Sequence, residues 1–512
     1  MPSALEQLRK IREKKHVEQP ISQEMPEESP TPKMGLYEAL AVFGHKEFRP
    51  GQEEVIQAVL DDSEGVLAVF PTGHGKSLAY QLPSLMSDKL TVVVSPLIAL
   101  MKDQVDALQK LGVNAILINS TLSEQETKLA LAEVSSGGVT ALYVSPERFG
   151  NPQFNRTIEK LDIDIFAVDE AHCISRWGHD FRPSYAQLGG VIERFNPRQV
   201  VALTATATQK VRDDICQILG IPDAKKFVRG VYRKNLTLAA MEATGIERLE
   251  QIALIAKEHR DLGGNTGIIY TATKKESESI CQFLKERGID ATFYHAGLKT
   301  TERSDIQNNW AGDGGVIVAT CAFGMGIDKA DVRFVIHSGL SQSIEDWYQE
   351  IGRAGRDGED SLCITFYDYR DDYRTQMFLI DLTNPSGKDI EIFWSWIKQA
   401  ARKVAKDDEK TVELKMTQKV MAAESGCVNV GGCIAFLKKK GLVKTLGRGR
   451  YEVAKDGEFD SSDVDVLRQE RIDKLNEVVN FYRSKECRAA YICGYFGDDT
   501  FEGSCGICDN CG

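Results

Sequence analysis

Short apolar runs alternate with amphipathic stretches between about residues 34 and 370, and they form two series. The first series is VLAVF, TVVVSPL, AILINS, TALYVSP, IDIFAVDE and QVVALTATAT, and the second is TGIIYTAT, ATFYHAG, GVIVATCAF, VRFVIHSG and SLCITFYD. Runs that are apolar on both faces are typical of parallel strands buried between helices. The alternation therefore predicts an α/β fold with two tandem, doubly wound domains, over residues 34–228 and 229–372.

The run VLAVF leads directly into the glycine-rich turn PTGHGKS at residues 71–77. In a phosphate-binding loop, backbone N–H groups and the next helix N-terminus hold phosphate oxygens, a lysine reaches the outer phosphates, and the next hydroxyl binds Mg²⁺. The residues that fit these roles are Thr72, Gly73, His74, Gly75, Lys76 and Ser77. Phe70 stands where the usual eight-residue pattern has its first glycine, so a chance glycine-rich turn is an alternative for this stretch alone.

Two adjacent acids end a buried run in FAVDEAH, residues 166–172. Asp169 suits Mg²⁺ binding, and Glu170 suits the orientation or deprotonation of an attacking water. Phosphoryl transfer needs a metal, a positioned nucleophile and charge stabilisation in addition to a phosphate cradle. The combination with GKS therefore favours nucleotide hydrolysis over a surface turn.

The segment YQEIGRAGRDG, residues 348–358, carries two arginines three positions apart and flanked by glycines. Arg353 and Arg356 suit stabilisation of transition-state charge when they are supplied across a cleft. Because they lie in the second α/β domain, we expect ATP to bind between the domains and hydrolysis to open and close that cleft. His172 and Gln349 complete the predicted catalytic set as relays.

The ordered motifs resemble those of the RecQ-type DNA helicases of superfamily 2. They are FGHKEFRPGQ, PTGHGKS, SPLIALMKDQV, YVSPERF, VDEAHCISRWGHDFRPSY, LTATAT, YHAGL, VATCAFGMGIDK and QEIGRAGRDG, and they cover residues 36 to 370. The resemblance implies two RecA-like domains and a DNA helicase that uses ATP and Mg²⁺. It also implies 3′→5′ translocation on single-stranded DNA and unwinding of duplex DNA, including forked duplexes, in recombination and repair.

Two further site assignments come from matching positions in this family. FRPGQ resembles the adenine-recognition motif, in which Gln52 reads the base edge and Arg49 assists, because a side-chain amide can pair with a donor and an acceptor together. HCISRWGHDFRPSY resembles an aromatic-rich loop that contacts DNA by base stacking and phosphate binding. The residues so implied are Arg176, Trp177, Phe181 and Arg182. A hydrophobic loop packed in the core is the alternative.

Two more motifs resemble segments that connect the sites. LTATAT, residues 203–208, resembles the motif that links the domains, and its threonine hydroxyls are expected to tie the DEAH strand to the ligand clamp. TCAFGMGIDK resembles the segment that senses both the nucleotide and the DNA backbone. The residues implied there are Gly324, Gly326 and Asp328.

Beyond residue 385 the pattern changes to helix, turn, helix and a short strand pair, in MTQKVMAAESGCVNVGGCIAFLKKKGLVKTLGRGRYEV. This order predicts a winged-helix-like domain over residues 385–455. Residues 410–455 hold ten Lys or Arg against three Asp or Glu, in a chain of net charge −12, which favours DNA binding through local basic surface. A small packing domain with solvated lysines is the alternative. The acidic stretch 456–465 is typical of a solvated linker.

A final helix, VLRQERIDKLNEVVNFYRSKECRAAYICGYF, is predicted before CGICDNC. Cys505, Cys508 and Cys511 need a fourth ligand for tetrahedral Zn²⁺. Cys487 and Cys493 are both available, and six positions apart on one helix they point to different faces, so only one joins. The segment resembles the RecQ zinc module, predicted over residues 466–512, and the family's Cys-Arg pair selects Cys487. A disulfide is the alternative, which a reducing cytosol disfavours.

The order of these C-terminal parts departs from the family, in which the winged helix usually follows the zinc module.

The composition argues against a membrane or secreted protein: no run of eighteen apolar residues is present, and the N-terminus lacks an apolar signal region. We therefore expect a mobile tail at residues 1–33, no membrane contact, and a cytoplasmic location, either nucleoid-associated or nuclear in a eukaryote. A nucleic-acid-stimulated ATPase that acts as a binding or remodelling factor, and an RNA helicase, are alternative functions.

Overall fold

The computed structural model describes residues 34–61, 65–178, 180–261, 266–324, 329–405, 410–458 and 462–511. The predicted tail at residues 1–33 lies outside them. The chain divides into two compact units. The first holds the residues up to Lys234 and also Gly324 and Ala489–Ser504, and the second holds Asn235–Phe323, Lys329–Arg488 and the segment from Cys505. Each unit is described by itself below.

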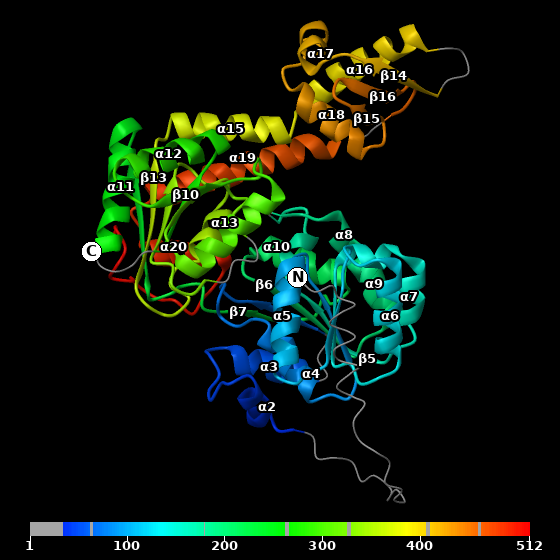
Figure 1. Ribbon diagram of the computed structural model, residues 1–512, viewed down its shortest axis with the longest axis vertical. Helices are drawn as coiled ribbons and strands as arrows, with labels where there is room; N and C mark the ends of the chain where they lie inside the picture. The colour runs from blue at the N-terminus through cyan, green and yellow to red at the C-terminus, as the bar shows by residue number, and fades with distance from the viewer. Residues whose placement is uncertain are drawn as a thin grey trace, which may run out of the picture. The chain divides into compact units, whose positions relative to one another are not determined.

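The first unit is built around a seven-stranded sheet in the order β3-β4-β2-β5-β6-β1-β7, in which every strand pair is parallel (Figure 1). Its elements are α2 (Leu36–Val42), α3 (Gln52–Leu60), β1 (Val66–Val69), α4 (Leu78–Leu85), β2 (Leu90–Val94), α5 (Ile98–Lys110), β3 (Ala115–Ile118), α6 (Glu124–Ser135), β4 (Ala141–Val144), η1 (Pro146–Gly150), α7 (Pro152–Ile158), β5 (Ile163–Val168), η2 (Ala171–Ile174), α8 (Pro183–Ala186), α9 (Leu188–Phe195), β6 (Gln199–Thr204), α10 (Gln209–Leu219) and β7 (Lys225–Val228). The strands expected from the first apolar series are all present, and β7 is an additional edge strand.

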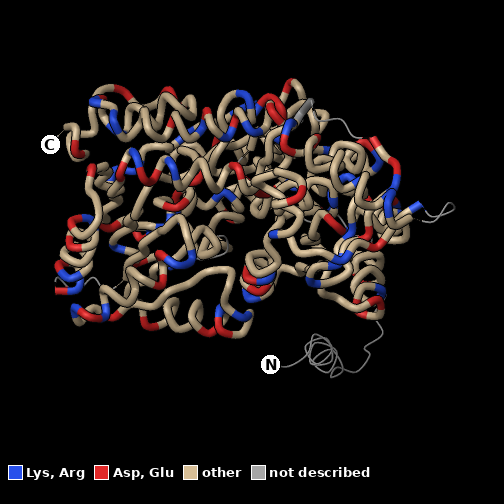
Figure 2. Tube along the Cα trace, turned by 90° about the horizontal axis from the view of Figure 1, so that it is seen from above, with Lys and Arg blue, Asp and Glu red and all other residues tan. Residues whose placement is uncertain are grey.

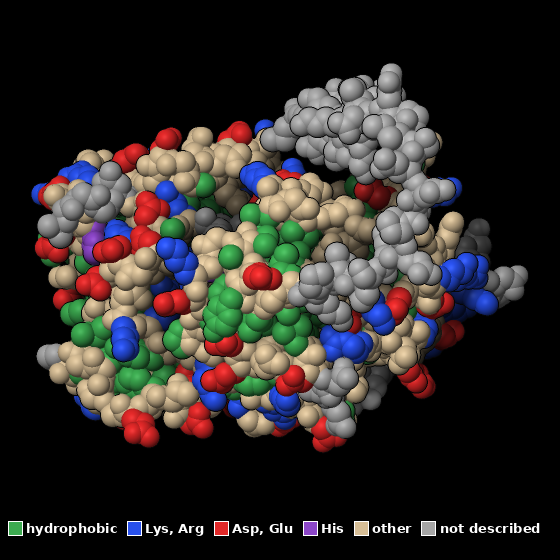
Figure 3. Space-filling model, turned by 90° about the horizontal axis from the view of Figure 1, so that it is seen from below, with side chains coloured by type: hydrophobic (Ala, Val, Ile, Leu, Met, Phe, Trp, Pro, Cys, Tyr) green, Lys and Arg blue, Asp and Glu red, His purple; other side chains and the backbone are tan. Residues whose placement is uncertain are grey.

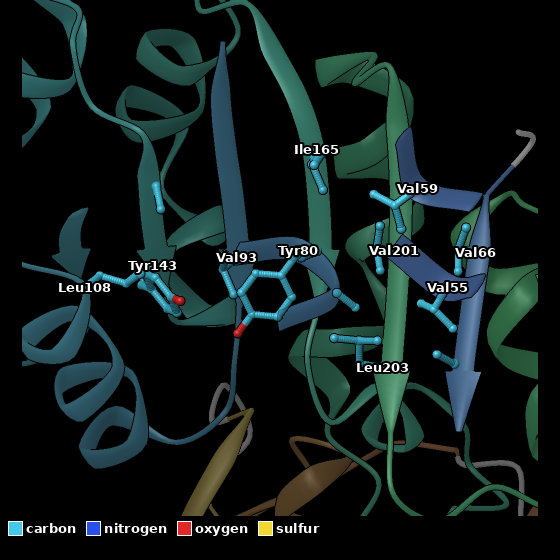
Figure 4. Packing of buried hydrophobic residues seen from close by; sticks show 14 of the residues in the cluster. Val55, Val59, Val66, Tyr80, Val93, Leu108, Tyr143, Ile165, Val201 and Leu203 are labelled. Carbon is cyan, nitrogen blue, oxygen red and sulfur yellow. The ribbon is translucent and has the colours of Figure 1, made fainter. Parts of the chain in front are cut away.

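The core of this unit explains why those runs are apolar on both faces. Every residue of β1, β2, β4, β5 and β6 is buried, as parallel strands are when helices cover both sides of the sheet. Figure 4 shows Val66, Val201 and Leu203 on neighbouring strands, with Val55 and Val59 of α3 packed against them. This packing fixes the position of the strand ends.

Parallel pairing decides where the predicted motifs lie. β5 pairs with β6, and β6 pairs with β1. PTGHGKS follows β1, DEAH follows β5, and the threonine-rich turn follows β6. Because parallel strands end at the same edge of a sheet, these three motifs lie side by side at the carboxyl edge.

The second unit contains a six-stranded parallel sheet in the order β10-β11-β9-β12-β13-β8. Its elements are β8 (Leu236–Glu242), α11 (Gly245–Asp261), β9 (Gly267–Thr271), α12 (Lys274–Glu286), β10 (Ala291–Tyr294), α13 (Thr300–Asp313), β11 (Val316–Ala319), β12 (Phe334–Ser338), α14 (Ile344–Ile351), β13 (Ser361–Tyr367), α15 (Asp371–Thr383), α16 (Gly387–Val404), β14 (Thr411–Lys415), α17 (Gln418–Ser425), α18 (Val430–Lys439), β15 (Val443–Gly447), β16 (Arg450–Ala454) and α19 (Ser462–Arg483). The last helix, α20 (Arg488–Phe496), belongs to the first unit except for Arg488. The five strands expected from the second apolar series are present, and β8 was not predicted.

The winged-helix-like domain is an insertion between two paired helices. α15 and α19 lie side by side (Figure 1) and run antiparallel, because Arg468 pairs with Asp381 at 2.6 Å and the Tyr373 hydroxyl donates to Asn476 Oδ1 at 3.0 Å. The chain between them forms α16, α17, α18 and the antiparallel sheet β14-β16-β15 around a core of its own. The insertion explains why this domain comes before the zinc-binding cysteines.

The single final helix predicted from the sequence is wrong. α19 ends at Arg483 and α20 begins at Arg488, so Cys487 lies in a break between two helices. Arg488 holds this break, because its guanidinium donates to the carbonyl of Phe481 and to both carboxylate oxygens of Asp509. Cys487 therefore lies outside the helix that carries Cys493, and the two cysteines do not share one helix as the sequence predicted.

Charged residues of both signs are interspersed among uncharged residues along the described trace (Figure 2). On the face shown in Figure 3 they are scattered among hydrophobic and uncharged side chains. The inserted domain differs: of the ten basic residues in 410–455, all but Lys455 are exposed. None of the described helices is by itself long and apolar enough to cross a membrane. Helices α17 and α18 together have the length and composition of a membrane span, but they are bent by 101° relative to each other.

Leu203→Ala should destabilise the first unit. Leu203 is fully buried in β6, and deletion of a buried leucine side chain costs about 2–5 kcal/mol because a cavity remains. Leu129, 52% exposed on α6, provides the matched control; Leu129→Ala should cost less than about 0.5 kcal/mol. Urea unfolding followed by circular dichroism measures both, and equal unfolding midpoints would contradict the assignment of this core.

Candidate nucleotide, DNA and metal sites

The PTGHGKS loop has the backbone shape of a phosphate cradle. Gly73 and Gly75 have φ of 81° and 76°, in the left-handed region that glycine adopts most easily. α4 begins directly after Ser77, so loop N–H groups and a helix N-terminus lie together, as an anion site requires. Lys76 Nζ lies over its own loop, 3.2 Å from the Phe70 carbonyl oxygen. Thr72 and His74 belong to the same turn.

Gln52 and Arg49, predicted for adenine recognition, hold this loop from the side. Gln52 Nε2 donates to the His74 carbonyl at 2.8 Å, and Gln52 Oε1 accepts from the Arg49 N–H at 2.8 Å. The Arg49 guanidinium donates to the Gly73 carbonyl, and a Cβ on Gly75 would lie 2.9 Å from Gln52 Nε2. Gln52 therefore supports the loop, a role that its sequence motif did not reveal.

The DEAH turn is tied to the threonine-rich turn by a buried hydrogen bond. His172 Nδ1 lies 2.9 Å from Thr204 Oγ1 and 3.3 Å from Glu170 Oε2. Glu170 has φ of 50°, a conformation that costs a residue with a Cβ about 1–3 kcal/mol. The Tyr185 hydroxyl donates to the Asp169 carbonyl at 3.1 Å. This network holds the two acids in one arrangement.

Asp169 is a buried carboxyl group, 7% exposed. Burial, and next the charge of Glu170, raise the pKa of Asp169 to about 7, whereas Lys76 acts in the opposite direction. A buried carboxyl group with too little positive charge around it fits a divalent cation. The oxygen donors of Asp169 and Ser77 are of the kind that Mg²⁺ prefers, so this chain has a donor set for that ion beside its phosphate loop.

Trp177, in the predicted DNA-contacting loop, is covered on one face. The Lys210 ammonium lies 3.2 Å from the Trp177 ring centroid, in a cation–π contact. The loop is pressed against the DEAH turn, because a Cβ on Gly178 would lie 2.3 Å from the His172 carbonyl oxygen. Trp177 is half-buried and Arg176 is exposed. The aromatic loop and the catalytic turn are thus in direct contact.

The side chains of Arg182 and Phe181 are less accessible for DNA contact than the sequence suggested. Arg182 donates twice to Asp180 Oδ2, at 3.0 and 2.9 Å, and once to the carbonyl of Pro96 at 3.3 Å. Phe181 is half-buried. The guanidinium of Arg182 therefore fixes the loop to the first unit, in addition to any phosphate contact.

The two arginines of the second unit differ in exposure. Arg353 is 5% exposed, whereas Arg356 is half-buried, with its Nε 3.4 Å from the Gly352 carbonyl. Gln349 is half-buried at the end of α14. Gly324 is buried, whereas Gly326 and Asp328 lie outside the described residues. The structure therefore holds Arg353 inside the second unit, whereas Arg356 is partly accessible.

Four cysteines form the predicted metal group. The Sγ atoms of Cys487, Cys505, Cys508 and Cys511 lie within 4.8 Å of one another. A Zn²⁺ ion with Zn–S bonds of about 2.3 Å places its sulfurs about 3.8 Å apart, so this donor set fits the ion. The Cys505 N–H donates to Cys487 Sγ at 3.2 Å, and the Arg488 N–H donates to Cys508 Sγ at 3.4 Å. Cys493 is buried in α20 and lies outside the group.

Three models of known protein families match successive parts of the chain, in the order of the two α/β domains and the cysteine group. Residues 49–215 match the DEAD/DEAH box helicases, 246–358 match the helicase conserved C-terminal domain, and 454–512 match the RecQ zinc-binding domain. The "ATP-dependent DNA helicase RecQ" of Bacillus subtilis is 43% identical over 341 residues. The chain belongs to the RecQ family.

This RecQ chain spans about half the length of the curated relatives that it matches. The alignment covers 66% of the chain and 57% of the Bacillus subtilis protein. For the "ATP-dependent DNA helicase Q-like 2" of Arabidopsis thaliana, 42% identical, it covers 64% and 47%.

Solved structures with the same fold include two helicases of low identity. The Mycobacterium smegmatis helicase Lhr bound to ssDNA and AMP-PNP has a TM-score of 0.52 at 16% identity, over 82% of this RecQ chain and 60% of that one. S. cerevisiae Dbp5 bound to RNA and ADP BeF3 has a TM-score of 0.51 at 19% identity, over 66% and 88%. At these identities the likeness shows a shared fold alone.

Two contributors to the RecQ sites were not found from the sequence. Lys210 follows the threonine-rich turn, and Tyr185 lies in α8. Each contacts a predicted residue that is distant along the chain, so no local spacing identified it. The position of Lys210, two residues after LTATAT, was the only available signal.

Cys487→Ser should remove bound zinc, whereas Cys493→Ser should leave about one zinc per chain. The reason is that Cys487 alone of this pair places its sulfur with the other three. Zinc content of the purified full chain, measured by atomic absorption, tests this expectation. The same zinc loss in both variants would contradict the assigned ligand set.

Proposed function

We propose that this chain is an ATP-dependent DNA helicase that translocates 3′→5′ on single-stranded DNA and separates duplex DNA during recombination and repair. The observation that carries the proposal is the meeting of GKS, DEAH and the threonine-rich turn at one sheet edge, joined by the His172–Thr204 hydrogen bond. That arrangement supplies what ATP hydrolysis needs, and the RecQ membership favours DNA as the polymer moved.

The proposed steps use residues of both units. Gly73, Gly75 and Lys76 bind the phosphates, with Thr72 and His74 in the same turn, while Arg49 and Gln52 hold the loop and contact the base. Glu170 orients and deprotonates the attacking water, and the neighbouring His172 keeps the Glu170 carboxylate in place. Gln349, Arg353 and Arg356 supply polar and positive groups from the second unit, and Gly324 and Asp328 contribute to nucleotide sensing. Arginine charge stabilises the transition state of phosphoryl transfer.

Two metals fit this mechanism in different ways. Bound Mg²⁺ neutralises phosphate charge, and Ser77 and Asp169 would hold it. Zn²⁺ at Cys487, Cys505, Cys508 and Cys511 would be structural, because four protein ligands leave no open coordination position. Asp509, next to Cys508, accepts from the Ala240 N–H at 2.9 Å, so the metal loop also covers the edge strand β8.

DNA contact is proposed for the loop after DEAH. Arg176 and Trp177 offer an exposed cation and an aromatic face, and Phe181 and Arg182 complete the loop. Because the loop touches the DEAH turn through Gly178 and His172, DNA binding would alter the position of Glu170. We also propose a cytoplasmic location at the DNA, in the nucleoid or the nucleus, with single-stranded and forked DNA as partners.

Lys76→Ala should reduce DNA-stimulated ATP hydrolysis to background, since the charge that binds the outer phosphates is lost. Single-stranded DNA binding, measured by fluorescence anisotropy, should stay within about threefold of wild type because Lys76 faces its own loop and not the aromatic segment. Lys160→Ala, an exposed lysine of the same unit, should retain full ATPase activity. Normal turnover by the Lys76→Ala protein would exclude this nucleotide site.

A forked duplex with a 3′ single-stranded tail should be separated with ATP and not with a non-hydrolysable analogue. The ATPase should respond more strongly to single-stranded DNA than to RNA of the same sequence. Stimulation by RNA alone would replace this proposal with an RNA helicase. DNA-stimulated hydrolysis with no strand separation would instead identify a remodelling factor, and unwinding only from 5′ tails would contradict the polarity.

A further inference from the structure

Arg212, in α10, joins the threonine-rich turn to the end of helix α20. The residue is buried and only 5% exposed. Its Nη1 atom donates to the Ala207 carbonyl at 2.9 Å and to the Phe496 carbonyl at 2.5 Å, and Nη2 donates to Gln209 Oε1 at 2.6 Å. A terminal guanidinium nitrogen carries two hydrogens, so one atom can serve both carbonyls. A single side chain therefore ties together two backbone segments that are far apart in the sequence.

The end of α20 is shaped to accept this guanidinium. The Phe496 carbonyl belongs to the last turn of the helix, whose carbonyls have no donor within the helix, and a positive charge is favourable at a helix C-terminus. Gly497, the next residue, has φ of 69°, and a Cβ there would lie 2.9 Å from Arg212 Nη2. The missing side chain at Gly497 therefore allows the close approach.

The residues that follow α20 are fixed to the rest of the first unit by further contacts. Asp498 is 4% exposed, and its Oδ2 atom accepts the Val231 N–H at 2.8 Å. The rings of Tyr232 and Phe501 meet edge to face, with centroids 4.7 Å apart. All four residues belong to the first unit. The end of α20 is therefore a fixed point to which a guanidinium can be tied.

The other carbonyl leads to the DEAH turn. Ala207 follows Thr206, whose N–H donates to Thr204 Oγ1 at 3.2 Å. The same Thr204 oxygen lies 2.9 Å from His172 Nδ1. Arg212 therefore holds the backbone of the turn whose threonine meets the DEAH histidine.

We propose that Arg212 is a positioning residue, which fixes the threonine-rich turn for ATP hydrolysis and makes the position of that turn depend on the end of α20. This inference rests on the proposed function, because it assumes that His172 and Glu170 act in ATP hydrolysis. Arg212 acts through the turn and is too buried to offer its charge to DNA. Since α20 lies in the part of the chain that matches the RecQ zinc-binding domain, that domain gains an influence on hydrolysis.

Arg212→Met tests the proposal, since it keeps an unbranched apolar side chain and removes the three hydrogen bonds. In the full chain, the kcat of DNA-stimulated ATP hydrolysis should fall about tenfold, the factor that corresponds to one hydrogen bond from a charged group. The KM for ATP should change less than about twofold, because the phosphate loop is unaltered. The number of ATP sites per chain, titrated with a fluorescent non-hydrolysable analogue, should equal that of wild type, whereas partial unfolding would lower it.

Arg198→Met is the matched control. Arg198 directly precedes β6, at the opposite edge of the sheet from the turn, and its Nε donates to Asp164 Oδ1 at 2.6 Å. The variant removes the same charged group from the same unit and should retain wild-type kcat. Binding of single-stranded DNA should be unchanged in both variants. An unchanged kcat in Arg212→Met, or an equal fall in both variants, would overturn the proposal.

Gly497→Ala disturbs the same contact from the other side, because its Cβ would displace the Arg212 guanidinium. This variant should also lower kcat. Combined with Arg212→Met it should lower kcat no further, because the group that it displaces is absent. A wild-type kcat in Gly497→Ala, or multiplicative losses in the double variant, would overturn the inference.

The Lys76→Ala protein separates this inference from the proposed function. If ATP hydrolysis is lost in Lys76→Ala and kept at the full rate in Arg212→Met, the inference is overturned and the nucleotide site stands. A wild-type protein without DNA-stimulated ATP hydrolysis would reject the proposed function, and the inference with it.

Discussion

The parallel pairing of β6 with β1 and β5 is the constraint on which the nucleotide chemistry of this RecQ-family chain depends. Thr204 is opposite Val69 in the ladder, and its carbonyl accepts the Phe70 N–H at 3.1 Å. The phosphate loop therefore starts beside the threonine whose hydroxyl meets His172. A shift of one residue would turn every side chain of β6 to the other face, so the buried core that fixes the register also fixes the site.

The sequence was sufficient to predict the features of the fold that depend on local residue patterns. Both apolar series became parallel strands, and the phosphate loop lies at a strand end as expected. The burial of Arg353 and the contact of Lys210 with Trp177 were not predictable, because they depend on residues far apart in the sequence. Cys487 was chosen over Cys493 by family resemblance; the helical argument offered beside it assumed one helix where the chain forms two.

The position of the inserted domain has a physical explanation in the helices that carry it. α15 and α19 run antiparallel, so the end of one lies near the start of the other, and the Asp381–Arg468 ion pair lies close to that point. A domain can be accepted where the two chain ends are close, since the surrounding fold is not distorted. The inserted part has its own core, which includes Phe393 and Leu437. Its exposed lysines can therefore vary without disturbing the zinc group.

Several residues of the proposed nucleotide site have a conformation or a buried charge that lowers the stability of the fold. Glu170 adopts a positive φ, Asp169 has a raised pKa, and Arg353 is buried with Nε unused by the described protein. Such departures persist only where neighbours hold them. In the first unit a neutral hydroxyl gives that support, because Thr204 holds His172, which lies 3.3 Å from the Glu170 carboxylate. A neutral group suits this task because it orients a charge without cancelling it, so the charge stays available for the phosphates.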